Sequence, residues 1–152
     1  MPRTKPGSLV GLAGAGLGFS ASVALGLKLA MPDRMIMPIM GDGTFYFSNP
    51  QSVLAVSQKY GLPIFAVVLD NSGWGAVKEA TLRVYPAGEA RASSEFGATF
   101  GPAMDFAKVA EACGAHGELV ADPDAVEPAI ARCLEAVRAG RSAVLHARVT
   151  KL

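Results

Sequence analysis

Residues 63–75 read Pro-Ile-Phe-Ala-Val-Val-Leu-Asp-Asn-Ser-Gly-Trp-Gly. The first seven residues are continuously apolar and rich in β-branched side chains, which predicts a strand buried on both faces. The stretch from Asp70 to Gly75 predicts a tight turn, because Asn, Ser and Gly favour turn conformations. Doubly buried strands are typical of a parallel sheet that is covered by helices.

Upstream, the turn Gly41-Asp42-Gly43-Thr44 follows a second short apolar run, residues 34–40, which we expect to be a strand. In a parallel sheet both turns emerge at the carboxyl ends of strands, where such folds bind ligands. Asp42 offers a carboxylate oxygen, Asn71 an amide oxygen and Gly73 a backbone carbonyl. Hard oxygen donors of this kind suit Mg²⁺. Either motif alone is an ordinary turn, so the interpretation depends on their combination.

The remaining pattern alternates helices and strands, which predicts an α/β fold with a doubly wound parallel sheet and helices on both faces. Residues 80–104 show little periodicity and are expected to form a variable loop. Pro38 is unusual inside a strand, because proline cannot donate to a sheet hydrogen bond and could distort the approach to Asp42. We expect helices at about 17–30, 50–60, 105–113 and 124–139, and further strands at 116–120 and 143–149.

Composition limits the possible functions. The chain has 152 residues, of which 51% are hydrophobic and 18% charged, as in a globular domain. Its net charge of +1 argues against nucleic acid or an anionic membrane surface as a partner. Cys113 and Cys133 lack metal or redox spacing, which favours reduced thiols in a cytoplasmic protein, and no signal peptide is evident. The glycine-rich run 9–27 favours a loop that enters a buried helix over a membrane span. His116 and His146 lie in expected strands and are expected to be structural.

The gap of 71 − 42 = 29 residues between Asp42 and Asn71 resembles the signature of thiamine-diphosphate-dependent enzymes. The chain is similar to their acetolactate synthase, 2-oxo acid decarboxylase and benzaldehyde lyase branch, in its C-terminal diphosphate-binding domain. The resemblance implies a lyase or transferase that acts on 2-oxo acids with thiamine diphosphate and Mg²⁺. The other matching stretches are Gly16-Leu17-Gly18-Phe19, Ala24-Leu25-Gly26, Asp105-Phe106, Val109-Ala110, Gly114-Ala115 and residues 140–144.

The resemblance also implies roles for individual residues. Mg²⁺ would be held by Asp42, Asn71 and the carbonyl of Gly73. Leu17 would lie under the cofactor and hold its two rings in a bent shape. The Ala15 carbonyl would accept a hydrogen bond from the cofactor's 4′-amino group. The diphosphate would be lined by Gly43, Thr44 and Trp74, and the cofactor-binding set also includes Gly16, Gly41 and Gly73.

Two features of the family have no counterpart here. In the family a pyrimidine-binding domain supplies a catalytic glutamate, and the metal-binding domain begins with a helix and a strand that would precede Met1. We therefore expect residues 1–152 to be a single, partial domain that is inactive without a pyrimidine-binding domain from the same or another chain. A homo-oligomer, dimer or tetramer, is expected, and a flavin would sit in a middle domain outside this sequence.

Several alternatives stay open. Decarboxylation, acetolactate-type carboligation and lyase action on an acyloin all fit, and the turn at 71–75 slightly favours carboligation. A non-catalytic subunit that binds the cofactor or serves assembly is a second possibility. A nicotinamide-binding domain is disfavoured, because Phe19 stands where the run from Gly14 would need its third glycine.

Overall fold

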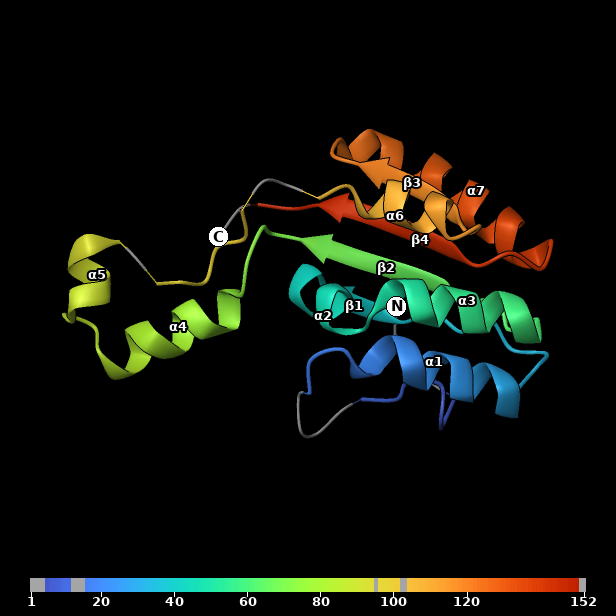
Figure 1. Ribbon diagram of the computed structural model, residues 1–152, viewed down its shortest axis with the longest axis horizontal. Helices are drawn as coiled ribbons and strands as arrows, with labels where there is room; N and C mark the ends of the chain where they lie inside the picture. Colours follow the sequence, from blue (N-terminus) through green and yellow to red (C-terminus); the bar gives the residue numbers. More distant parts are fainter. Residues whose placement is uncertain (1–4, 12–15, 95, 102–103, 151–152) are drawn as a thin grey trace.

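The computed structural model describes residues 5–11, 16–94, 96–101 and 104–150. Within them a four-stranded, wholly parallel sheet has the strand order β1-β2-β4-β3 (Figure 1). Helices lie on both faces, which confirms the predicted doubly wound sheet. The strands are β1 (Ile39–Gly41), β2 (Phe65–Asp70), β3 (His116–Val120) and β4 (Ala143–Arg148).

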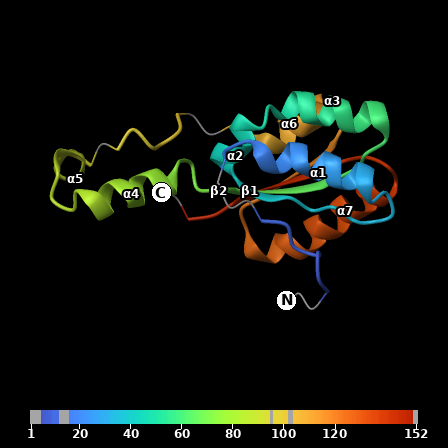
Figure 2. The ribbon, with the colours of Figure 1, turned by 90° about the horizontal axis from the view of Figure 1, so that it is seen from below.

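The helices divide into two layers and a projecting arm (Figure 2). Helices α3 and α6, with α1 beside α3, enclose one face of the sheet together with alternate strand residues such as Met40, Val68 and Val144. Helix α7 covers the other face over Phe65 and Leu145. The bounds are α1 (Phe19–Ala30), α2 (Asp42–Phe47), α3 (Pro50–Tyr60), α4 (Gly75–Val84), α5 (Glu89–Ser93), α6 (Phe106–Ala112) and α7 (Val126–Arg138), with a short 3₁₀ turn (Pro123–Ala125) before α7.

Most predicted elements are confirmed, with adjusted ends. Helix α3 begins at Pro50, and Asp105 caps α6 by accepting a hydrogen bond from the Lys108 N–H at 3.1 Å. The first strand is shorter than expected, because it starts at Ile39, after Pro38. The Pro38 carbonyl accepts a hydrogen bond from the Val67 N–H at 2.9 Å, so this proline joins the sheet as an acceptor only.

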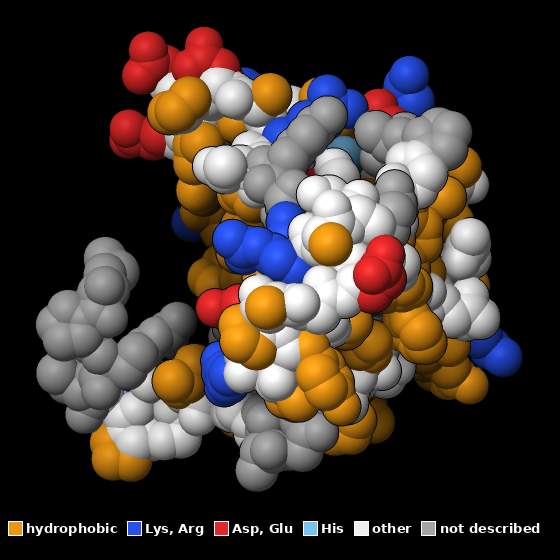
Figure 3. Space-filling model, turned by 90° about the vertical axis from the view of Figure 1, so that its left-hand side faces the viewer, with side chains coloured by type: hydrophobic (Ala, Val, Ile, Leu, Met, Phe, Trp, Pro, Cys, Tyr) orange, Lys and Arg blue, Asp and Glu red, His pale blue; other side chains and the backbone are white. Residues whose placement is uncertain are grey.

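The expected loop at 80–104 is wrong for residues 80–84 and 89–93, which lie in the helices α4 and α5. These helices project from the body as an arm (Figure 1). Neither helix buries a side chain. Figure 3 views the molecule from the side of the arm and shows hydrophobic side chains among charged ones on that face. Two signals for α4 were overlooked in the loop prediction: the helical spacing of Val77, Ala80 and Val84, and the strong helix formers Ala, Lys, Glu, Leu and Arg. The arm instead exposes large apolar side chains, among them Val77, Val84 and Tyr85. No helix in the described part of the chain has the length and apolarity to cross a bilayer.

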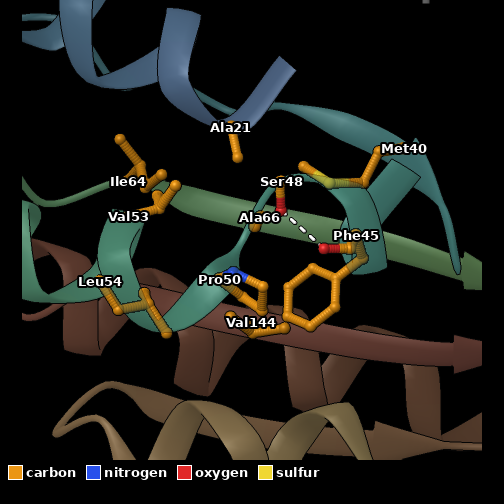
Figure 4. A pocket seen from close by; sticks show the side chains of 10 residues that line it. All are labelled: Ala21, Met40, Phe45, Ser48, Pro50, Val53, Leu54, Ile64, Ala66 and Val144. Atoms are coloured by element: carbon orange, nitrogen blue, oxygen red, sulfur yellow. Dashed lines mark hydrogen bonds between the residues drawn. The ribbon is translucent and has the colours of Figure 1, made fainter. Parts of the chain in front are cut away.

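A small apolar pocket lies between α1, α2, α3 and the sheet (Figure 4). Its walls include Ala21, Val53 and Val144, and the Ser48 hydroxyl at its edge donates to the Phe45 carbonyl at 2.7 Å. The cavity of about 10 Å³ is close to the smallest that can hold one water. It is therefore a packing gap in the core and too small for an organic ligand.

Helix α6 lies so close to β3 that only glycine fits at position 117. A Cβ atom added to Gly117 would be 2.2 Å from the Ala107 carbonyl oxygen. We expect Gly117→Ala to lower the free energy of unfolding by about 2 kcal/mol, since α6 must shift to relieve this backbone contact. The measurement is urea unfolding followed by circular dichroism.

Gly26→Ala is the matched control for that substitution. Gly26 lies inside α1, and an added Cβ there meets nothing within 4 Å. It should raise the free energy of unfolding by up to about 1 kcal/mol, the usual gain when alanine replaces glycine inside a helix. Equal effects of the two substitutions would contradict the close α6–β3 packing.

Candidate functional site

The carboxyl ends of β1 and β2 bring the two predicted motifs together. Gly41, the last residue of β1, is in register with Leu69 of the neighbouring β2. Asp42, which follows β1, therefore lies beside the start of the turn that follows β2. Asp42 is 2% exposed and starts helix α2. Its Oδ1 accepts a hydrogen bond from the Gly43 N–H at 2.8 Å, and its Oδ2 accepts one from the Gly73 N–H at 3.0 Å. One carboxylate therefore joins the ends of two strands.

The turn after β2 is held by its own side chains. The Asn71 Oδ1 accepts a hydrogen bond from the Gly73 N–H at 3.2 Å, and the Asp70 Oδ1 accepts one from the Ser72 N–H at 2.8 Å. Ser72 has φ 65°, a left-handed conformation that is uncommon outside glycine. The surrounding hydrogen bonds hold the backbone in this conformation.

Residues 98–100 return from the arm and pair antiparallel with this turn. The Trp74 N–H donates to the Ala98 carbonyl at 2.7 Å, and the Phe100 N–H donates to the Ser72 carbonyl at 2.9 Å. Gly73 opposes Thr99 between these two bonds, so its own N–H and carbonyl face away from Thr99. Because its N–H donates to Asp42, the Gly73 carbonyl faces the same side as that carboxylate.

Trp74 packs directly on the first turn of α2. A Cβ atom at Gly43 would lie 2.4 Å from the Trp74 Nε1, so this contact requires glycine. The indole also meets Phe100 edge-on, with ring centroids 4.7 Å apart. Its N–H is buried and has no acceptor among the described residues. A buried donor without a protein acceptor calls for an outside oxygen, from water or from a ligand.

The carboxyl groups of Asp42 and Asp70 both lie at this end of the sheet, and their pKa values are shifted in opposite directions. Burial raises the pKa of Asp42, and the neighbouring Asp70 raises it further, against the hydrogen bonds from Gly43 and Gly73. Burial acts on Asp70 in the same direction. However, the hydrogen bonds from His146 and Ser72 outweigh it and leave the pKa of Asp70 below its ordinary value. A cation at this place would relieve the mutual repulsion of the two groups.

Comparison with known proteins identifies the family. The family model described as "Thiamine pyrophosphate enzyme, C-terminal TPP binding domain" matches residues 1–147. The chain belongs to this family. This confirms the resemblance to thiamine-diphosphate-dependent enzymes that the two motifs indicated.

Relatives of the thiamine pyrophosphate enzyme family differ in activity. The chain is 30% identical over 141 residues to acetolactate synthase isozyme 3 large subunit of Escherichia coli, covering 92% of this chain and 23% of the relative. It is 32% identical over 155 residues to 2-hydroxyacyl-CoA lyase of rice, Oryza sativa, covering 95% of this chain and 23% of the relative. It therefore spans less than a quarter of the length of these relatives.

A solved structure from the same family has the same fold. The thiamine diphosphate-dependent 4-hydroxybenzoylformate decarboxylase of Rhodococcus jostii superposes with a TM-score of 0.73 at 25% identity. The match covers 90% of this chain and 24% of that one. The parallel sheet with helices on both faces is thus the fold of a thiamine-dependent enzyme.

Some of the residues predicted from the family lie together and others lie apart. Direct contacts join Asp42 and Gly43 to Gly73 and Trp74, with Asn71 in the same turn. Gly41 ends β1 next to this group, and Thr44 is half-buried in α2.

The predicted residues before α1 lie at the other end of α2. Gly16 and Leu17 are exposed, and the following Gly18 packs against the Phe47 carbonyl. Ala15 lies outside the described residues. Phe47 in turn lies beside Trp74, with ring centroids 6.2 Å apart, so among the described residues Leu17 is linked to the site through Gly18 and Phe47.

Sequence reasoning missed three residues of this region. Asp70 and His146 form a buried pair, with His146 Nε2 2.7 Å from Asp70 Oδ2. Phe100 comes from the expected loop and packs on Trp74. One signal was available for His146, because a histidine inside the apolar run 143–147 requires a buried partner.

Trp74 is the only tryptophan of the chain, so its fluorescence reports on the contact with Gly43. We expect Gly43→Ala to displace the indole and shift its emission to the red, because the added Cβ overlaps the Trp74 Nε1. Gly41→Ala is the matched control, since the nearest atom to its new Cβ lies at 3.9 Å. An unchanged spectrum in Gly43→Ala would contradict the close packing of Trp74 on α2.

Proposed function

We propose that this chain holds Mg²⁺ and the diphosphate of thiamine diphosphate in an enzyme that decarboxylates or joins 2-oxo acids. The observation that carries this proposal is the link between Asp42 and Gly73, since it gathers the oxygen donors that follow β1 and β2 on one side of the turn. The family match, whose description names TPP binding, supports the cofactor.

The donor set fits a hard divalent cation. The Asp42 carboxylate, the Asn71 amide oxygen and the Gly73 carbonyl would be its protein ligands, and Mg²⁺ completes its octahedron with phosphate oxygens and water. The described residues contain no group of three or more His, Cys, Asp or Glu side chains that could hold a metal. A site with one carboxylate, one amide and one backbone oxygen therefore needs the phosphate oxygens to complete it.

The other residues would orient the cofactor. Gly43 would line the diphosphate through its backbone, beside the Trp74 indole that occupies the place of a side chain. The Thr44 hydroxyl and the Trp74 N–H, which has no acceptor among the described residues, can donate to phosphate oxygens. Leu17 would support the bent shape of the cofactor, with Gly16 and the Ala15 carbonyl beside it. Bound thiamine diphosphate would supply the carbon-centred chemistry on the 2-oxo acid, while these residues would supply position and electrostatics.

The complete active site requires a second domain. We propose that a pyrimidine-binding domain, of this protein or of another chain, contributes the glutamate that activates the cofactor, in a homo-oligomer. Support comes from the length of the relatives, because this chain covers 23% of acetolactate synthase isozyme 3 large subunit and 23% of 2-hydroxyacyl-CoA lyase. Similarity to acetolactate synthases favours carboligation over simple decarboxylation, while the decarboxylase fold match keeps both open.

The alternative is a non-catalytic subunit that binds the cofactor. Turnover of pyruvate by this chain, alone or mixed with a pyrimidine-binding domain from a family member, separates the two functions. Acetolactate or acetaldehyde as product would establish the enzyme and its class. Cofactor binding without turnover in every mixture would establish the non-catalytic role.

Cofactor binding should depend on Asp42 and Asn71. Asp42→Ala removes the carboxylate from the cation, so thiamine diphosphate should bind at least about 100-fold more weakly in the presence of Mg²⁺. Asn71→Leu removes one neutral oxygen and should weaken binding less. Isothermal titration calorimetry with and without Mg²⁺ measures both effects.

Asp33→Ala is the control for these variants, because Asp33 is exposed in the loop before β1. It should bind the cofactor like the unaltered chain. Undiminished Mg²⁺-dependent binding in Asp42→Ala would refute the proposed site.

Leu17 offers a separate test of cofactor shape. Leu17→Ala should leave the affinity for thiamine diphosphate nearly unchanged and slow the exchange of the cofactor's C2 proton in the complete enzyme. Proton exchange is followed by NMR in deuterated water. An exchange rate equal to that of the unaltered enzyme would mean that Leu17 has no part in shaping the cofactor.

A further inference from the structure

The side chain of His146, in the middle of β4, is fully buried and uses both ring nitrogens. Its Nδ1 accepts a hydrogen bond from the Phe106 N–H at 3.3 Å. The Asp105 carboxylate, 3.9 Å from the same nitrogen, is too far away for a hydrogen bond. Since the Phe106 N–H can only donate, Nδ1 carries no proton. The proton of a neutral imidazole then resides on Nε2, which donates to the Asp70 Oδ2 at 2.7 Å.

Asp70 connects His146 to the turn that follows β2. Its second oxygen accepts the hydrogen bond from the Ser72 N–H at 2.8 Å, so both oxygens of the carboxylate are occupied. Ser72 stands in the left-handed region with φ 65°, a conformation that persists only where neighbouring groups enforce it. The direction of Asn71 and of the Gly73 carbonyl depends on this backbone.

A continuous path therefore runs from the first N–H of α6 through His146 and Asp70 to the turn. Val68 of β2 is in register with His146, and Asp70 lies two residues further along the same face. The ring of Phe106 also packs on His146, with centroids 4.6 Å apart. These contacts fix the imidazole in one orientation, with its N–H directed at Asp70.

We propose that His146 is a positioning residue for the metal- and diphosphate-binding turn, acting through Asp70 on the backbone at Ser72. This inference rests on the proposed function, in which the same turn supplies Asn71 and Gly73 to Mg²⁺. Without the donated hydrogen bond, the buried Asp70 carboxylate loses its partner and turns toward other donors or water. The turn is then free to leave the conformation that points its oxygens at the cation.

The other histidine provides a matched comparison. His116 also lies in a strand and also has a carboxylate partner, with its Nε2 2.9 Å from Glu118 Oε1. His116 begins β3 opposite Ala143, the first residue of β4, and so lies at the amino ends of the strands. Asp70 ends β2 and lies at the opposite, carboxyl ends. Loss of His116 should therefore affect stability without affecting the cation.

The test uses titration calorimetry on the whole chain to measure the Mg²⁺ concentration at which thiamine diphosphate binding is half-maximal. His146→Leu should raise this concentration at least about tenfold, as for other partners that orient metal ligands. His146→Gln should restore most of the affinity, because its terminal amide can donate to Asp70 in place of Nε2–H. His116→Leu should leave the concentration unchanged. Circular dichroism melting verifies that each variant is folded.

The possible failures are distinguishable. An unaltered chain that binds no thiamine diphosphate at any Mg²⁺ concentration would overturn the proposed function and this inference together. Binding by the unaltered chain with the same Mg²⁺ dependence in His146→Leu would overturn the inference alone. A His146→Gln variant as weak as His146→Leu would show that the donated hydrogen bond is not the cause.

A measurement on the unaltered chain covers the case in which His146→Leu does not fold. In ¹⁵N NMR the Nε2–H signal of His146 should shift as Mg²⁺ and thiamine diphosphate are added, with the midpoint of cofactor binding. The His116 ring signals should stay in place. A His146 signal that does not move during cofactor binding would refute the coupling.

Discussion

The hydrogen bond from the Gly73 N–H to the Asp42 carboxylate is the interaction on which the site depends. It joins the ends of two neighbouring parallel strands through a buried side chain. A buried carboxylate is stable only where hydrogen bonds or a cation compensate its lost hydration. Asp42 has two backbone N–H donors, while the nearby Asp70 adds negative charge. The structure thus brings two carboxyl groups close together, where a bound divalent cation would stabilise their negative charges.

The apolar core makes this concentration of charge possible. Alternate residues of β2 enter the two core layers, so the strand is covered on both faces and its end is fixed in position. Asp42 follows β1, Asp70 ends β2 and His146 lies within β4, so these three polar residues are held by a rigid frame. Such a frame holds ligands at defined distances without help from a mobile loop. The apolar core and the proposed cation site therefore lie in different parts of the same strands, the middle and the carboxyl end.

Much of this arrangement could be predicted from the sequence, because two signals agreed. The run at 63–69 specified a doubly buried strand, and the spacing of Asp42 and Asn71 specified where two turns meet. The helical arm could not be predicted from a buried face, since α4 and α5 bury no side chain; the helical spacing of Val77, Ala80 and Val84 was its available signal. Nor could the pairing of His146 with Asp70, because it depends on the register between β2 and β4. The left-handed Ser72 is likewise a product of hydrogen bonds between segments far apart in sequence.

The projecting arm connects the proposed cation site with a surface of exposed apolar side chains. A helix of ten residues is marginal in water without tertiary contacts, and α4 has no buried residue in this chain. Its N-terminal residue follows Trp74, and residues 98–100 return from it to the same turn, so the arm begins and ends at the proposed cation site. The exposed side chain of Val77, near the start of α4, therefore lies on the part of the arm that adjoins the proposed cation site, while Val84 and Tyr85 lie at its far end. A second domain that both packs against the arm and completes the active site would satisfy these two requirements with one interface.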